Sequence, residues 1–187
     1  MTANAQGSGG PHPGGWRLLL WGGAAGLLSL PLIAMQFTRE VDWTAADLAV
    51  FGAMLAAACG ACELAVRLAR GNRAYRFGAF IAIAAGFLLV WVNLAVGFIG
   101  SENNPANLMY AGVLGVGVLG ACLGRFRPRG MAATMLAVAA AQFAAGVIAH
   151  AGDMDHPWPA TVGFTALWLA SAGLFRIAAR SAGRMPS

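Results

Sequence analysis

Lysine is absent from this chain of 187 residues, and charged residues of all kinds make up only 10% of it. A soluble globular domain is about a quarter charged and close to half apolar. Here 59% of the residues are hydrophobic. The shortage of charge therefore excludes a soluble globular protein. It also excludes an intrinsically disordered chain, which needs a polar composition to avoid collapse.

Cysteine and catalytic motifs are also scarce. Of the 3 cysteines, Cys59 and Cys62 form a C-x-x-C pattern inside an apolar run, and Cys122 lies in another run. In a soluble redox fold this spacing would indicate a reactive thiol pair. Within a membrane helix we interpret the cysteines as small structural hydrophobes, with a redox or metal-binding role as the alternative. No nucleophile elbow, phosphate loop or HExxH motif occurs, so we predict neither enzymatic activity nor a cofactor.

Six apolar runs dominate what is present, and each is long enough to cross a bilayer as a helix, which takes roughly 17–25 residues. Backbone polar groups find no water in lipid, so these runs must be helical. They cover residues 17–36, 45–66, 77–99, 107–124, 131–150 and 160–178. The sequence thus predicts an all-α integral membrane bundle of six transmembrane helices over residues 16–180. A disordered tail (1–15) is expected before it, and a short basic tail (181–187) after it.

The 12 basic residues, all arginine, lie at the ends of these runs. If the runs alternate in direction, Arg39 alone lies on one side, together with six of the 7 acids, and every other arginine lies on the opposite side. By the positive-inside rule both termini are predicted to be cytoplasmic. The net charge of +5 therefore indicates membrane orientation rather than nucleic-acid binding, for which no motif occurs. Arginine without lysine, together with abundant alanine and glycine, is typical of a GC-rich bacterial genome, which places the chain in a bacterial inner membrane.

Two segments of the chain resemble each other weakly. Residues 47–62 and 107–122 align without a gap and share five residues, among them the pairs Gly52/Gly112 and Gly60/Gly120. An alanine- and glycine-rich chain produces part of this agreement by chance. The sequence leaves open whether the bundle is built from tandem helical-hairpin repeats.

Small residues recur at four-residue spacing in two of the runs. Gly52, Ala56 and Gly60 follow this spacing in the second run, and Gly120 and Gly124 follow it in the fourth. Such spacing lets helix backbones approach closely in a membrane. We predict that these positions pack against neighbouring helices of the chain, and a seam between copies in a homo-oligomer is the alternative.

Polar side chains inside the runs are few. Glu63 lies near a helix end, four residues before Arg67, which favours an ion pair between them. The alternative is proton or cation coupling, because an acid within a membrane helix often marks a transport pathway. Asn93 and Gln142 lie inside their spans, where amides usually bond another helix; a role in a solute pathway is the alternative.

One predicted outer loop concentrates potential metal ligands. It contains His150, Asp153, Asp155 and His156, and Glu102 lies in another loop on the same side. Imidazole and carboxylate groups bind several divalent metals. The spacing matches no established site, so we favour a solvated polar surface and keep metal binding as a second hypothesis.

Three stretches, FTREVDWT, GNRAYRF and LLVWVNLAVGFIGSENNPANLMY, together resemble small multi-pass bacterial inner-membrane proteins of unknown function. The resemblance implies a multi-pass membrane protein and carries no activity or site residue. From the whole sequence we predict a small non-catalytic membrane protein with an accessory, assembly or scaffold role. The alternatives are a channel or permease for a small solute or ion, and a membrane redox or metal-binding protein. The expected partners are membrane lipid and another membrane protein or a second copy of the chain, but no nucleic acid.

Overall fold

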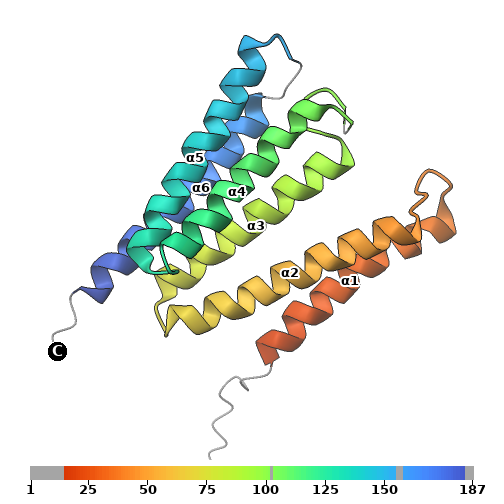
Figure 1. Ribbon diagram of the computed structural model, residues 1–187. Coiled ribbons are helices and arrows are strands. Elements are labelled where there is room, and N and C mark those ends of the chain that lie inside the picture. Colours follow the sequence, from red (N-terminus) through yellow and green to blue (C-terminus); the bar gives the residue numbers. More distant parts are fainter. Residues whose placement is uncertain (1–14, 102, 155–157, 184–187) are drawn as a thin grey trace, which may run out of the picture. The chain divides into compact units, whose positions relative to one another are not determined.

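The computed structural model describes residues 15–101, 103–154 and 158–183. Within this part of the chain the secondary structure is entirely helical (Figure 1). The helices are α1 (Gly15–Phe37), α2 (Ala45–Ala69), α3 (Arg73–Ala95), the short 3-10 helix η1 (Pro105–Asn107), α4 (Leu108–Leu123), α5 (Pro128–Ala151) and α6 (Trp158–Ala182). Counting η1 with α4, six helices are long and apolar enough to cross a membrane. The predicted fold class, an all-α protein with six such helices, is confirmed.

The predicted tails lie largely outside the described residues, which begin at Gly15 and end at Gly183. The disorder expected over residues 1–15 therefore falls almost wholly on residues that are not described. At the other end, α6 continues to Ala182, past residue 180 where the membrane region was expected to stop.

The third helix ends earlier than the apolar run predicts. The run continues to residue 99, whereas α3 stops at Ala95. Gly97 then adopts a φ of +75°, and a Cβ atom at this position would lie 2.6 Å from the backbone of Ser101. Only glycine fits such a turn. Phe98 and Ile99 are consequently buried from a loop, not from a helix.

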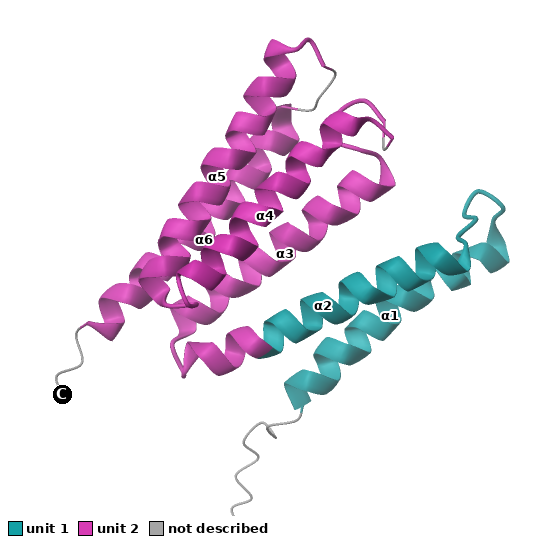
Figure 2. Ribbon diagram, in the orientation of Figure 1, with its two compact units in different colours: residues 1–63 teal, residues 64–187 magenta. Residues whose placement is uncertain are grey.

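The chain divides into two compact units, residues 1–63 and 64–187 (Figure 2). Unit 1 contains α1 and most of α2, and unit 2 contains the end of α2 together with α3 to α6. The division falls inside α2, so the region predicted over 16–180 comprises two packing units.

Unit 1 is a pair of helices joined by a short loop. Thr44 and Asp47 cap the start of α2 reciprocally, because the Asp47 carboxylate accepts from the Thr44 backbone N–H at 2.8 Å and the Thr44 hydroxyl accepts from the Asp47 N–H at 3.2 Å. Between the helices, a Leu28 methyl group lies 3.6 Å from where a Cβ of Gly52 would stand. The Cys59 thiol lies 3.8 Å from the Leu20 carbonyl oxygen.

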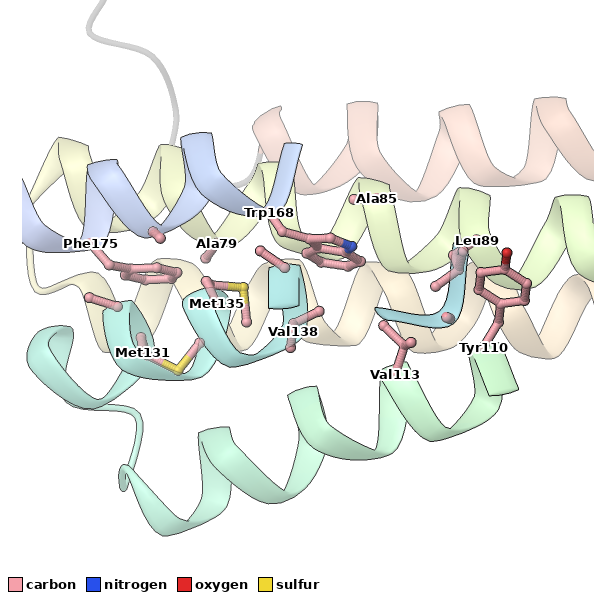
Figure 3. Close-up of a cluster of buried hydrophobic side chains, with 14 of the residues drawn as sticks. Ala79, Ala85, Leu89, Tyr110, Val113, Met131, Met135, Val138, Trp168 and Phe175 are labelled. Atoms are coloured by element: carbon pink, nitrogen blue, oxygen red, sulfur yellow. The ribbon is translucent and has the colours of Figure 1, made fainter. Parts of the chain in front are cut away.

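Unit 2 is built around α5, which packs against both α4 and α6, while α6 also packs against α3. Its core is lined by side chains that are almost fully buried, among them Leu89, Val138 and Phe175 (Figure 3). Near one end of the core the rings of Tyr75 and Phe175 meet edge to face at 5.0 Å. The Tyr75 hydroxyl donates to the Phe126 carbonyl at 2.8 Å, which ties α3 to the loop before α5.

Glycines set the spacing between α4 and α5, as the sequence predicts. A Cβ atom on Gly120 would lie 2.7 Å from Thr134, and one on Gly124 would lie 3.0 Å from the Cα of Gly130. Real Cβ atoms essentially never show the contact that Gly120 would make and rarely show the one at Gly124, so a larger residue would force Thr134 or the backbone at Gly130 to shift.

The same four-residue spacing is used differently in α2. Gly52 contacts Leu28, but Ala56 and Gly60 are exposed, and no heavy atom lies within 4 Å of where a Cβ of Gly60 would stand. Within unit 1 the close contact predicted at Gly60 is therefore not made, and its packing against a further helix stays a prediction. Unit 1 makes its contacts through the α2 face that carries Gly52 and Cys59, and Gly60 lies one residue further round the helix, a rotation of about 100°.

This difference bears on the repeat. Gly60 and Gly120 occupy equivalent positions in the two aligned segments, yet Gly60 is open and Gly120 is tightly packed. The other pair is reversed, since Gly52 contacts Leu28 while Gly112 has no neighbour within 4 Å. Equivalent positions of the two segments thus differ in how closely they are packed. The tandem repeat stays a prediction from sequence.

Candidate functional site

Glu63 is the centre of a hydrogen-bonded cluster within unit 1. The Arg17 guanidinium donates to both carboxylate oxygens, through Nη2 at 2.6 Å and Nε at 3.0 Å. The indole N–H of Trp21 donates to the same carboxylate at 2.9 Å. Arg17 and Trp21 are four residues apart on α1, so their side chains leave the same face of that helix. The Glu63 side chain is only 12% exposed, whereas that of Arg17 is 51% exposed.

The partner observed for Glu63 thus comes from another helix. The sequence predicts a pair with Arg67, four residues further along α2; that pair stays a prediction beside the observed contact with Arg17. A fork-shaped guanidinium on a carboxylate is among the stronger charge-assisted contacts in proteins. Both oxygens of Glu63 are engaged by fixed donors. The geometry therefore favours a structural contact of Glu63 between α1 and α2 over a role in proton or cation transport.

A cleft of about 390 Å³ opens in unit 2, where the 97–107 loop meets α3 and α4. Its polar wall consists of asparagine and tyrosine side chains, and its apolar wall consists of aliphatic residues. The polar lining residues are Asn93, Asn103, Asn104, Asn107 and Tyr110. A small cleft of this kind, with a few convergent polar groups, is a default candidate for ligand binding.

Asn107 organises the loop beside this cleft. Its side-chain oxygen accepts from the backbone N–H groups of Phe98 at 3.0 Å and Ile99 at 2.9 Å, and its Nδ2 donates to the Ser101 carbonyl at 2.7 Å. Sequence reasoning missed this residue, because its partners are defined only once the chain has turned at Gly97. Asn93 donates to the Asn107 carbonyl at 3.2 Å, which is the bond to another element that the sequence predicts for it.

Gln142 lies in the interior of unit 2. Its side chain is fully buried on α5, and neither its amide nitrogen nor its amide oxygen has a hydrogen-bond partner among the described residues. Leaving a buried polar group unpaired costs about 1–3 kcal/mol. Gln142 does not line the cleft that holds Asn93.

The predicted metal ligands are only partly described. Glu102, Asp155 and His156 lie outside the described residues. His150 closes α5, where its ring meets that of Trp158 at 5.6 Å, and Asp153 follows with a φ of +50°. The described part of the chain contains no group of three potential metal ligands. Metal binding by the full set stays a hypothesis.

The cysteines are separate thiols. Cys59 is buried and Cys62 half-buried in unit 1, while Cys122 is exposed on α4 in unit 2. None forms a disulfide with another described cysteine. The contact of Cys59 with the Leu20 carbonyl fits its interpretation as a small packing residue, and the redox alternative stays untested.

A feature that sequence reasoning missed lies on α1. Gly22 and Gly26 form a G-x-x-x-G pair, and no heavy atom lies within 4 Å of a Cβ placed on either residue. By helical periodicity this pair faces away from Arg17, Trp21 and Leu28, which contact α2. The four-residue spacing was visible in the sequence, but the contacts between α1 and α2 were needed to show that this glycine face is not used within unit 1.

Comparison with protein-family models, curated proteins and solved structures finds no match to this chain. The roles of its residues therefore rest on the geometry described above.

Proposed function

We propose that this protein is a small non-catalytic accessory protein of a bacterial inner membrane, which holds a partner membrane protein or a second copy of itself through the open face of α1. The observation that supports it most directly is the G-x-x-x-G pair Gly22 and Gly26, which is turned away from the α2 contact and left unpacked within unit 1. Small residues at this spacing are a common seam for helix association in lipid.

The engagement of Glu63 supports the same function. An acid within a membrane helix is the strongest sequence argument for transport. Here it accepts three hydrogen bonds from Arg17 and Trp21, and so acts as a structural link within unit 1. These bonds fix the rotation of α1 against α2, so the same face of α1 is always available to a partner.

The proposal is tested by affinity purification from native membranes in a mild detergent. The wild type is compared with Gly22→Ile/Gly26→Ile, which fills the α1 face. The matched control, Gly112→Ile/Gly115→Ile, fills two glycines of α4 that also have open space around them. We expect the wild type and the control to retain a stoichiometric membrane partner or a second copy, and the α1 variant to lose it. If the α1 variant keeps the partner, or if both variants lose it equally, the proposal is contradicted.

A channel or permease is the second candidate, and Gln142 favours it. A fully buried amide without a partner is expensive in a packed interior, and transport pathways keep such groups for passing solutes. Stopped-flow light scattering of proteoliposomes with glycerol or urea distinguishes the two functions. The accessory function predicts permeability equal to that of empty liposomes. Faster permeation that Gln142→Leu abolishes would establish the second candidate instead.

A further inference from the structure

A second cavity, of about 370 Å³, lies where the first turns of α5 meet the last turns of α6 in unit 2. Three arginines line it: Arg129 from α5, and Arg176 and Arg180 from α6. The two α6 arginines are four residues apart and so share one helix face. The rest of the lining is small or aliphatic, and consists of Ala132, Ala133, Leu136 and Ala179. Alanines at the floor leave room between the arginine side chains.

Among the described residues, no carboxylate neutralises the positive charge of this arginine groove. None of the three arginines forms an ion pair with a described residue. Among the described residues of unit 2 the only acid is Asp153, which follows the opposite end of α5. At about 1.5 Å per residue along α5, that carboxylate lies roughly 36 Å from Arg129 and about 25 Å from Leu136, well beyond the Debye length of about 8 Å at physiological salt.

The backbone adds to the same potential. α5 begins at Pro128, and no side chain caps its first turn. The N–H groups of a first helical turn carry a partial positive charge that favours an anion. Arg129 belongs to this turn, so the partial positive charge of the helix terminus lies beside one of the three arginines of the groove.

The position of the groove along the helices indicates the kind of anion. Arg129 is the second residue of α5, and Arg180 lies two residues before the end of α6, so both are at the ends of membrane-length helices. Lipid phosphates lie at this depth. Arg176 is one turn deeper, beside Leu136, where the first part of an acyl chain would run. Guanidinium groups match phosphate oxygens through paired N–H bonds.

We propose that the arginine groove is a specific site for the phosphodiester headgroup of an anionic phospholipid. Arg129, Arg176 and Arg180 bind the phosphate, the positive end of α5 adds to their potential, and the apolar wall at Leu136 holds the start of an acyl chain. Basic pockets between membrane helices are a recognised way to select anionic lipids. This site is independent of the accessory function, because it lies in unit 2 and does not use the α1 face.

Native mass spectrometry of the full chain in a neutral detergent tests the site by titration with dioleoylphosphatidylglycerol. The groove variant is Arg129→Gln/Arg176→Gln/Arg180→Gln. The matched control, Arg70→Gln/Arg73→Gln/Arg76→Gln, removes the same charge from residues between α2 and α3 and in the first turn of α3, none of which lines the groove. We expect the groove variant to bind phosphatidylglycerol about tenfold more weakly than the wild type and the control to stay within about twofold, since hydrogen bonds between charged groups are the strong ones.

Two further titrations in the same experiment show whether the bound phosphate belongs to a lipid or to a soluble anion. Dioleoylphosphatidylcholine should bind the wild type and both variants equally weakly, and inorganic phosphate at the same concentration should not displace phosphatidylglycerol. Equal weakening in the groove and control variants would overturn the proposal in favour of general charge attraction. Displacement by inorganic phosphate would overturn it in favour of a soluble anion. If the triple groove variant does not fold, Arg180→Gln alone should weaken binding about threefold, and an unchanged affinity in it would overturn the site.

Discussion

Single residues decide how closely the helices of unit 2 approach. On α5, a Cβ atom at Gly146 would lie 2.6 Å from the side chain of Thr161 on α6. On α3, a Cβ atom at Gly78 would lie 3.3 Å from the Ser171 carbonyl, while the Ser171 hydroxyl donates to the Gly78 carbonyl at 2.8 Å. Without a hydrophobic driving force between helices in lipid, such close contacts and interhelical hydrogen bonds supply much of the association energy.

The substitution Gly146→Ala should therefore destabilise unit 2. An added methyl group overlaps Thr161, and overpacking of this kind costs about 1–3 kcal/mol. The control is Gly112→Ala, whose methyl group would meet open space and should be neutral or slightly stabilising, because alanine favours a helix. Thermal unfolding in detergent measures both. Adding Thr161→Ala to Gly146→Ala should restore part of the loss; equal stability of the two single variants would contradict the packing.

At the scale of helices, the sequence predicted which elements exist better than how they face one another. The runs identify all six helices because length and apolar composition suffice. Which face of each helix is turned toward its neighbours is harder to predict. These helices are apolar on nearly every side, so hydrophobic periodicity does not identify the buried face. For this reason the spacing rule does not distinguish Gly120, which packs tightly against α5, from Gly60, which meets no neighbour within unit 1. Likewise, a partner four residues along the helix can be read from sequence, but Arg17, 46 positions away from Glu63, cannot.

The link between α1 and α2 can be measured by a double-mutant cycle. Arg17→Ala and Glu63→Gln each remove one side of the ion pair, and the double variant removes both. We expect a coupling free energy of about 1–3 kcal/mol in detergent unfolding, because the pair is bidentate and the carboxylate is largely buried. Leu18→Ala, an exposed position on the same helix, serves as a control and should show no coupling to Glu63→Gln. Additive losses for Arg17 and Glu63 would mean that the pair does not join the helices.

For the whole molecule, the distribution of arginine predicts orientation. Both termini should lie in the cytoplasm, because all arginines except Arg39 fall on one side of the six spans. A fluorescent protein that folds only in the cytoplasm should be active when fused after residue 185. Alkaline phosphatase, which is active only outside the cytoplasm, should be active when fused after residue 41. The opposite pattern, or a C-terminus outside, would contradict the six-span topology.

The accessory function depends on α1 meeting another protein through its glycine face, and site-specific photocrosslinking in intact membranes tests this most directly. A photoreactive residue at Ile33 lies on the same face as Gly22 and Gly26, whereas one at Leu27 lies to the side of it, and both positions are exposed. The account predicts a discrete protein adduct from position 33 and much less from position 27. Lipid adducts alone from both positions would contradict it.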